Sequence, residues 1–309
     1  MSQQKTVAVM DLGTNTFHLL IAQGTAAAYN EIVHKSLPAK LGEGGINKGV
    51  IIPAAFERGM AAMQQYEQDI AKNSVDSIKA VATSALRNAA NGQEFIDKVR
   101  VLTGIDIELI NGEQEATYIY KGVKLAGSLG AQTSLIMDIG GGSVEFILCN
   151  ADEIFWKQSF EIGAARLMDK FHQVDPIPAS SIAELHFYLE EKLAPLFKAA
   201  KQYKVESIIG SSGAFETFAE IIELDKRNPF DLKNIKNYPF ETSELIAVTD
   251  KLIASSHQQR KSMEGIVSIR VDMIVVASLL TRFVMDTLKV ATIKLCTNSL
   301  KEGILADML

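Results

Sequence analysis

The chain has 309 residues, of which 47% are hydrophobic, and a formal net charge of −6. This length suffices for two domains with separate cores, and the acidic balance argues against a nucleic-acid coat protein or a membrane-surface binder. The most apolar segment, residues 273–285, is too short to span a bilayer, and the first residues lack a signal-peptide pattern. Only two cysteines occur, each in an apolar run, so we expect a cytoplasmic protein without disulfides. No histidines or cysteines have the spacing of zinc ligands, so we expect no zinc site.

The first half of the chain is predicted to form five strands and three helices. Its expected strands are residues 5–10, 17–23, 27–34, 78–82 and 105–110. Its expected helices are residues 53–71, 93–102 and 113–124. A glycine-rich segment, residues 42–49, lacks the strand and helix context of a dinucleotide site, so we expect a mobile loop that borders the ligand.

The second half is predicted to repeat this order. Its expected strands are residues 133–138, 143–150, 153–160, 205–209 and 291–295. Its expected helices are residues 164–171, 180–203, 242–255, 270–288 and one that starts near residue 299. We interpret residues 121–132 as a hinge between the halves and residues 225–240 as a surface excursion.

One short phrase occurs twice, as VMDLGTNT in residues 9–16 and as IMDIGGGS in residues 136–143. Each copy is an apolar strand that ends in aspartate, followed by a glycine turn and a second strand, which is typical of a β-hairpin. Backbone N–H groups at such turns converge on anions, so two facing copies predict a phosphate clamp. The expected phosphate ligands are Gly13, Thr14, Asn15, Gly140, Gly141, Gly142 and Ser143.

A third phosphate element is predicted in residues 207–214, where a strand enters small residues and then a helix. The N-terminus of that helix would present unpaired N–H groups to an anion, with Ser211 and Gly213 as binding residues. An ordinary strand-to-helix connection uses the same residue types. The combination with the two aspartate-glycine hairpins favours phosphate binding.

Acidic residues beside the two hairpins predict a magnesium site. Asp138 is the expected anchor, with Asp11 opposite, and water would complete the shell because Mg²⁺ dehydrates reluctantly. Glu145 follows Asp138 by seven residues, as His18 follows Asp11, and we interpret Glu145 as a metal or water ligand. A solvated strand position for Glu145 and a satisfied buried polar role for His18 are the alternatives.

The duplicated plan of three strands, helix, strand and helix resembles the actin, sugar-kinase and Hsp70 superfamily. The resemblance implies an α/β fold of two ribonuclease H-like, actin-like ATPase domains with an inter-domain cleft. We expect the domains at residues 1–124 and 125–298, with a terminal helix, residues 299–309, that packs back on the first. Hinge closure around the substrate would follow from this plan.

Four motifs narrow the resemblance to one family. They are VATSALR in residues 81–87, INGEQEA in residues 110–116, DIGGGSVE in residues 138–145 and LKEGIL in residues 300–305. In this order and over the whole chain they resemble the exopolyphosphatase and guanosine pentaphosphate phosphohydrolase family. The resemblance implies Mg²⁺-dependent hydrolysis of a terminal phosphoanhydride bond, and it marks the chain as a short form without the extra C-terminal helical domain. Lys40 and Lys301 stand where that family commonly has arginine.

The catalytic base implied by the resemblance is Glu115. Glu113 and Glu115 both lie in an expected first helical turn capped by Asn111, where helix-dipole stabilisation alone explains acidic residues. Two residues apart they point to different helix faces, so at most one lines the site, and the family phrase selects Glu115. Arg87 is the preferred cation for the phosphates because its planar fork matches phosphate oxygens, and Arg166 is the second choice. Neutralisation of a helix terminus is the alternative role of Arg87.

Three classes of function remain open. The first is an exopolyphosphatase in which water, activated by Glu115, attacks the terminal phosphorus of inorganic polyphosphate, with hydrolysis of guanosine pentaphosphate (pppGpp) at the same site as its close variant. The second is a sugar or acetate kinase, and the third is a non-catalytic actin-like nucleotide-binding module. No residue separates polyphosphate from pppGpp, and the resemblance implies a homodimer.

Overall fold

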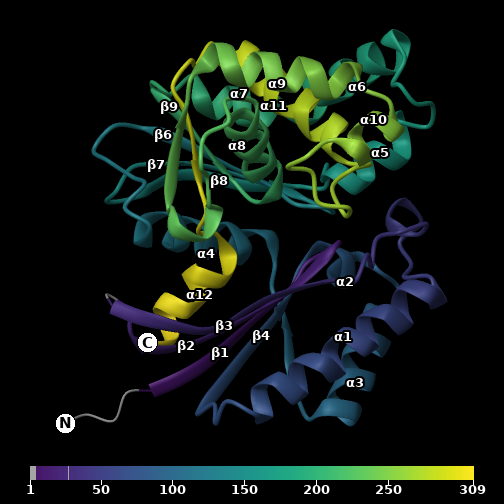
Figure 1. Cartoon of the computed structure of the whole chain (residues 1–309), viewed down its shortest axis with the longest axis vertical. Coiled ribbons are helices and arrows are strands. Elements are labelled where there is room, and N and C mark those ends of the chain that lie inside the picture. Colours follow the sequence, from purple (N-terminus) through teal and green to yellow (C-terminus); the bar gives the residue numbers. More distant parts are fainter. Residues whose placement is uncertain (1–4, 27) are drawn as a thin grey trace. The chain divides into compact units, whose positions relative to one another are not determined.

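The computed structural model describes residues 5–26 and 28–309 and divides the chain into two compact units. Unit 1 contains the described residues up to Leu125 together with Ser299–Leu309, and unit 2 contains Ala126–Asn298. The chain therefore leaves unit 1 once and returns to it for its last helix, which is yellow among the purple and blue elements of unit 1 (Figure 1).

Unit 1 is built on a five-stranded sheet with strand order β3-β2-β1-β4-β5. The strands are β1 (Lys5–Leu12), β2 (Thr16–Thr25), β3 (Ala28–Pro38), β4 (Ser77–Ala82) and β5 (Ile107–Leu109). The helices are α1 (Pro53–Ala71), α2 (Ser84–Asn88), α3 (Gly92–Thr103), α4 (Gly112–Leu125) and α12 (Leu300–Met308), and a 3₁₀ turn lies at Ile46–Lys48. The first three strands are antiparallel, whereas β4 runs parallel to β1 and β5 parallel to β4.

Both faces of the central strand β1 are covered, which explains why its residues are buried almost without interruption. Alternate residues such as Met10 belong to the core under α1 and α3, where Phe56 and Phe95 meet edge to face at 5.1 Å. Helix α12 packs against β1 and lies along α4. A strand buried on both faces reads as a continuous apolar run, and residues 7–10 have that pattern.

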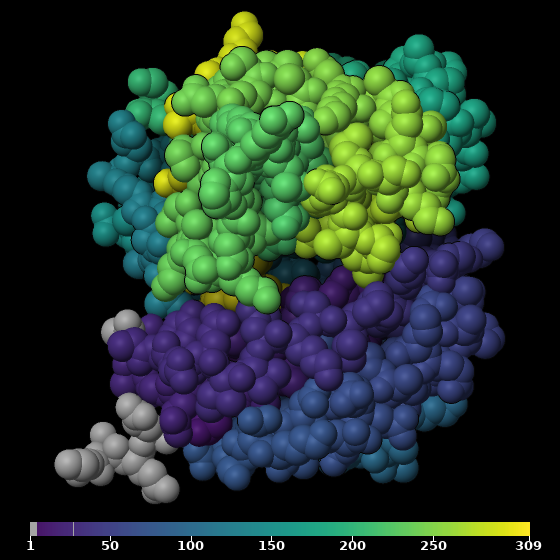
Figure 2. Space-filling view, in the orientation of Figure 1, coloured from purple at the N-terminus to yellow at the C-terminus, as the bar shows by residue number. Residues whose placement is uncertain are grey.

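Unit 2 is built on a six-stranded sheet with strand order β10-β11-β9-β6-β7-β8. The strands are β6 (Ser134–Ile139), β7 (Val144–Cys149), β8 (Ile154–Phe160), β9 (Ser207–Ser211), β10 (Asn237–Phe240) and β11 (Ile293–Cys296). The helices are α5 (Ala164–Phe171), α6 (Ala179–Lys192), α7 (Ala194–Ala200), α8 (Gly213–Asp225), α9 (Thr242–Ala254), α10 (His257–Ser262) and α11 (Ile274–Leu288), with a 3₁₀ turn at Leu232–Asn234. The green to yellow-green segments that follow β9 make most of the face of unit 2 presented in Figure 2.

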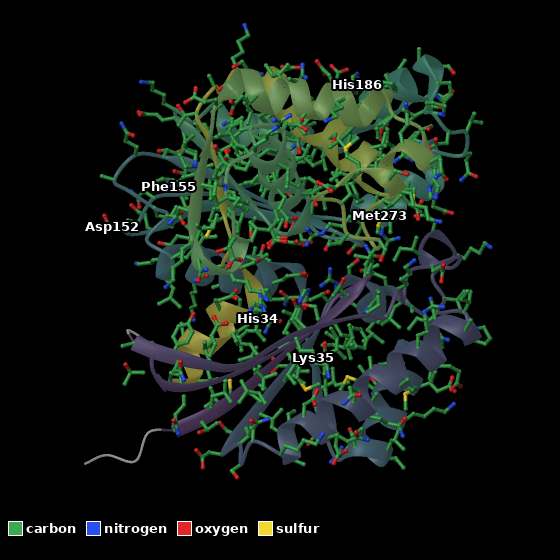
Figure 3. The ribbon with its side chains drawn as sticks, viewed as in Figure 1. His34, Lys35, Asp152, Phe155, His186 and Met273 are labelled. Carbon is green, nitrogen blue, oxygen red and sulfur yellow. The ribbon has the colours of Figure 1, made fainter. Side chains whose placement is uncertain are left out.

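Aromatic contacts stabilise the packing of the outer elements of unit 2. Phe155 of β8 stacks on Tyr203 with ring centroids 5.0 Å apart, and the ring of His186 on α6 lies 5.5 Å from that of Phe283 on α11 (Figure 3). Such pairs add a small stabilisation beyond their buried area. His186 is thereby a packing residue of the helical layer.

The two sheets begin with the same hairpin, which confirms the duplication that the repeated phrase predicts. Asp11 pairs with His18 in the β1–β2 ladder, and Asp138 pairs with Glu145 in the β6–β7 ladder. Even the irregularity is repeated: the register of β2 with β3 shifts between residues 21 and 22, and that of β7 with β8 shifts 127 residues later, between residues 148 and 149. The expected mixed α/β fold of two duplicated domains is therefore confirmed.

Two predicted elements are wrong in detail, and the predicted hinge stays a prediction. Residues 180–203 form two helices, α6 and α7, because Pro195 lies in the first turn of α7 and has no N–H with which to continue α6. Residues 225–240 are not only a surface loop, because they include strand β10, which pairs with β11 at the edge of the sheet. The predicted hinge, residues 121–132, overlaps α4, which continues to Leu125.

Smaller differences concern the ends of elements. Helix α11 begins at Ile274 instead of residue 270, and the short helices α2 and α10 were absent from the prediction. Residue 27, predicted to begin a strand, lies outside the described residues, and β3 runs from Ala28 to Pro38. No helix in the described parts of the chain is both long and apolar enough to cross a membrane.

Helices α4 and α12 cross with their backbones in contact. A Cβ atom added to Gly303 would lie 1.8 Å from the carbonyl oxygen of Tyr118, and one added to Gly122 would lie 2.0 Å from that of Ser299. Backbone atoms cannot yield as a flexible side chain can. Only glycine is therefore compatible with this crossing.

We expect Gly303→Ala to destabilise unit 1 by about 1–3 kcal/mol, because the methyl group forces the two helices apart. The measurement is the urea midpoint of unfolding followed by circular dichroism. Gly130→Ala is the matched control: a Cβ there meets no atom within 4 Å, and its midpoint should equal that of the wild type. Equal midpoints for both variants would contradict the close crossing.

Candidate active site

The turn between β1 and β2, residues 13–16 (loop 1), is closed by its first glycine. Gly13 N donates to Thr16 O at 3.1 Å, and a Cβ on Gly13 would lie 2.9 Å from that same oxygen. The carbonyls of Thr14 and Asn15 accept from the backbone amides of Gly42 and Lys40, at 3.2 and 2.8 Å. The segment after β3 therefore holds loop 1 in place.

The turn between β6 and β7, residues 140–143 (loop 2), has the same construction. Gly140 N donates to Ser143 O at 3.1 Å, and a Cβ on Gly140 would lie 2.9 Å from that oxygen. The start of α5 lies against this loop, just as residues 40–42 lie against loop 1. Both turns thus have the form that the repeated phrase predicts for phosphate binding.

Two carboxylates lie side by side next to loop 2. Asp138 and Glu145 occupy directly opposed positions on neighbouring antiparallel strands, so their side chains lie on one face of the sheet. Asp138 is 6% and Glu145 1% exposed, and Ser159 Oγ donates to Glu145 Oε1 at 2.6 Å. Two carboxylates buried side by side repel each other, so burying both charges is costly. A cation between them would relieve that repulsion, which makes the pair a favourable place for one.

The donor set fits Mg²⁺. This ion takes oxygen ligands, usually one or two carboxylates, and keeps several of its own waters. Among the residues that the structure describes, no group of three or more His, Cys, Asp or Glu side chains is placed to hold a metal.

The equivalent position in unit 1 is chemically different. His18 Nδ1 lies 2.8 Å from Ser36 Oγ, which repeats the contact between Glu145 and Ser159 with an imidazole in place of the carboxylate. Asp11 therefore has an imidazole where Asp138 has a second acid. Since Mg²⁺ prefers oxygen ligands, unit 2 offers the better anchor.

The connection from β9 to α8, residues 210–213 (loop 3), is tied to loop 2. Ser211 pairs in register with Asp138, and Ser212 Oγ donates to the carbonyl of Ile139 at 2.9 Å. Ser212 has a φ of 74°, a left-handed conformation that is strained for a serine. The predicted ligand Ser211 is fully buried, and its hydroxyl lies 3.5 Å from Asn298 O.

A residue that the sequence did not indicate lies over the start of α8. A Cβ on Gly213 would be 2.4 Å from Nε of Arg270, whose guanidinium also reaches Glu216 at 2.6 Å and Thr217 at 3.1 Å. Arg270 precedes α11 and lies in no motif of its own, so only the tertiary structure reveals this contact. A side chain at position 213 would displace the guanidinium from this place.

The predicted base lies in unit 1 at the start of α4. Asn111 and Gln114 form reciprocal capping hydrogen bonds, both 2.9 Å, which begin the helix as the sequence suggests. Glu115 is 6% exposed whereas Glu113 is exposed, so the two acids do point to different environments. The exposures differ because residues two positions apart on a helix point to different faces.

Arg87 contacts the predicted base. Its Nη1 donates to Glu115 Oε2 at 3.0 Å and to the carbonyl of Ile110 at 3.0 Å. The side chain is 19% exposed and lies at the end of α2, next to β4. The guanidinium that we expected on a phosphate thus fixes the orientation of the Glu115 carboxylate and compensates its buried charge.

Comparison with known proteins supplies the family. The Ppx/GppA phosphatase family model matches residues 20–309. The chain belongs to the Ppx/GppA phosphatase family. Among solved Ppx/GppA-like structures, a Cytophaga hutchinsonii exopolyphosphatase is 38% identical, with a TM-score of 0.96 over 98% of this chain and 97% of the other. An Aquifex aeolicus Ppx/GppA family member at 23% identity and TM-score 0.80, covering 99% of this chain and 98% of its own, shares the fold.

Curated relatives of this Ppx/GppA chain are longer than it is. A guanosine-5′-triphosphate,3′-diphosphate pyrophosphatase from Aeromonas salmonicida is 26% identical over 98% of this chain. The match covers 59% of that relative, as it does for the protein of the same description from Aeromonas hydrophila. The chain therefore spans about three-fifths of the length of these relatives.

The two lysines that differ from the expected Ppx/GppA arginines have defined positions. Lys301 lies in the first turn of α12 and pairs with Glu302 at 3.0 Å. Lys40 has a left-handed φ of 45°, and its backbone, through the amide bonded to Asn15, supports loop 1. The backbone of Lys40 therefore contacts loop 1 directly.

Proposed function

We propose that this Ppx/GppA chain is a Mg²⁺-dependent exopolyphosphatase that removes the terminal phosphate of inorganic polyphosphate. The observation that carries the proposal is the buried Glu115 carboxylate held by Arg87, in a fold with two matching phosphate-type turns. The name of the Cytophaga hutchinsonii structure supports the substrate, because that protein is 38% identical over nearly both whole chains.

In the proposed reaction, the Glu115 carboxylate orients a water molecule and accepts its proton. The water oxygen bonds to the terminal phosphorus while the bond from that phosphorus to the bridging oxygen breaks, so orthophosphate and a chain shorter by one phosphate are formed. Each unit offers the N–H groups of its own turn, loop 1 or loop 2, as donors to phosphate oxygens, where charge is spread in the transition state.

Asp138 and Glu145 would hold Mg²⁺ in unit 2, with Asp11 as the carboxylate that unit 1 offers. When bound, the ion neutralises negative charge on the phosphate oxygens. Ser159 holds one oxygen of Glu145 through a 2.6 Å hydrogen bond and so limits how its carboxylate can turn. The chain's own contribution is therefore a pair of acids with restricted orientation.

Hydrolysis of pppGpp to ppGpp is the second candidate, because the Aeromonas relatives carry that type of name at 26% identity. It would use the same groups, since pppGpp also ends in a phosphoanhydride. The kinase and binding-module alternatives receive no support from the match to a phosphatase family.

The test is phosphate release by the purified chain from long-chain polyphosphate, pppGpp and ATP in parallel, with Mg²⁺ and with a chelator. We expect rapid release from polyphosphate that the chelator abolishes. Release from pppGpp alone would promote the second candidate, and no release from any of the three would reject the hydrolase assignment.

A homodimer and a cytoplasmic location stay predictions that follow from the family resemblance and the cysteine usage. Light scattering after size-exclusion chromatography tests the first. A mass of one 33.7 kDa chain at all concentrations would contradict it.

A further inference from the structure

Three carbonyl oxygens of loop 2, those of Gly140, Gly141 and Gly142, accept hydrogen bonds from the start of α5. Ala164 and Ala165 donate to Gly140 and Gly141, both at 2.9 Å, and Gly163 donates to Gly142 at 3.2 Å. A trans peptide group is planar, so its N–H points opposite to its C=O. Holding these three carbonyls toward α5 therefore aims the N–H groups of residues 141–143 the other way.

This contact requires glycine at the entry to α5. A Cβ on Gly163 would lie 2.4 Å from the carbonyl carbon and oxygen of Gly141 and 2.5 Å from the carbonyl carbon of Gly142. Gly163 has φ −60°, which any residue adopts, so the space and not the backbone angle excludes a side chain. Helix and loop are thus in backbone contact.

Arg166 completes the arrangement. Its Nε donates to the carbonyl of Gly142 at 2.8 Å, and its Nη2 donates to Glu161 Oε2 at 2.9 Å. The Arg166 side chain is 14% exposed, and Glu161 at 43% is half in solvent. A guanidinium can make two such directed bonds at once because its donors form a rigid fork.

Unit 1 repeats the arrangement with different residues. Lys40 and Gly42 donate to loop 1 in the places of Gly163 and Ala165, which follow them by 123 residues. Arg58 steadies that segment by donating to the carbonyls of Ala39 and Lys40, at 3.1 and 3.2 Å, and pairs with Glu43 at 2.5 Å. Each phosphate-type turn thus has a backbone support and an arginine paired with a glutamate.

We propose that Arg166, oriented by Glu161, is a positioning residue that holds the N–H groups of loop 2 in their phosphate-binding arrangement before the ligand arrives. The proposal rests on the proposed function and deepens it, since donors fixed in advance are the main source of electrostatic stabilisation in a dry site. It differs from the direct phosphate contact that the sequence suggested for this residue.

Kinetics of three variants separate the two roles. For a positioning residue, we expect Arg166→Met to lower kcat for polyphosphate on the order of 100-fold, with a smaller change in KM, because misplaced donors weaken the transition state most. Arg166→Lys should behave like the methionine variant, since one ammonium cannot bond Gly142 and Glu161 as a fork does. A lysine variant with near wild-type kcat would overturn the proposal.

Glu161→Gln separates the two roles most clearly, because one role predicts a lower kcat and the other predicts a lower KM without loss of kcat. If Arg166 positions the loop, losing its charged partner lowers kcat several-fold, in the direction of Arg166→Met. If Arg166 binds phosphate directly, removing a competing anion lowers KM and leaves kcat unchanged or higher. The second result would also overturn the proposal.

Amide hydrogen exchange tests the proposal by a measurement that does not depend on catalytic activity. We expect the amides of residues 163–165 to exchange faster in Arg166→Met than in the wild type, since they lose the fixed loop carbonyls as acceptors. Arg100→Met removes an exposed arginine paired with Asp106 at 3.0 Å and is the matched control, with no change expected. Unchanged exchange in Arg166→Met overturns the positioning role, whereas inactivity of the wild type on every substrate rejects only the proposed function.

Discussion

Glu115→Gln is expected to lower kcat for phosphate release by about 10²–10⁴-fold, the usual contribution of a general base. The amide keeps the shape of the side chain and an oxygen that can still accept from Arg87, so the fold should be retained. What is lost is the negative oxygen that takes the proton of the attacking water. The measurement is steady-state phosphate release from polyphosphate with Mg²⁺.

Glu113→Gln is the matched control for this prediction, because it makes the same chemical change two residues earlier on the exposed face of α4. Its kcat should stay within about twofold of the wild type, as expected for a substitution away from buried groups. Equal losses of kcat in both variants would mean that activity depends on negative charge near the start of α4 in general. That result would reject Glu115 as the base. Full activity of Glu115→Gln would reject it directly.

Asp138→Asn is expected to abolish stabilisation by Mg²⁺ and to lower activity by more than about 100-fold. In the wild type, Mg²⁺ at 100 times its Kd should add about 2.7 kcal/mol of stability, because the proposed site exists only in the folded chain. Without Mg²⁺ the asparagine variant should melt at the same temperature as the wild type or higher. The reason is that one of the two opposed buried acids no longer repels the other.

Thermal melts with and without Mg²⁺ make this measurement independent of catalysis. Asp152→Asn is the control, since Asp152 is an exposed residue of the β7–β8 turn in the same unit (Figure 3). Its melting temperature should rise with Mg²⁺ as in the wild type. An Asp138→Asn variant that Mg²⁺ still stabilises fully would move the metal site elsewhere.

The sequence was most informative where the structure is local. Residues 140–143 are a glycine turn between two apolar runs, so the hairpin and its copy in unit 1 follow from neighbouring residues alone. The capping pair of Asn111 and Gln114 is equally local, which is why the start of α4 and the separation of Glu113 from Glu115 could be predicted.

Contacts between distant segments could not be predicted. The partner of Arg87 lies 28 residues away on another helix, and Arg270 meets Gly213 only because α11 returns beside α8. Strand β10 is a further example, since Pro239 is atypical of a strand and the partners of β10 on β11 lie between 53 (Phe240 with Ile293) and 59 (Asn237 with Cys296) residues later in the chain. The break at Pro195, by contrast, is local, since a proline has no N–H with which to continue the preceding helix.

The return of the chain to unit 1 divides the core of that unit between two distant parts of the sequence. Unit 2 is one continuous stretch, Ala126–Asn298, whereas unit 1 takes its helix α12 from beyond that stretch. Ile304 and Leu305 are almost completely buried, and the glycine crossing with α4 forms only with this helix present. Unit 1 is therefore split in sequence by the whole of unit 2, so residues 5–125 alone lack a helix that their own core needs.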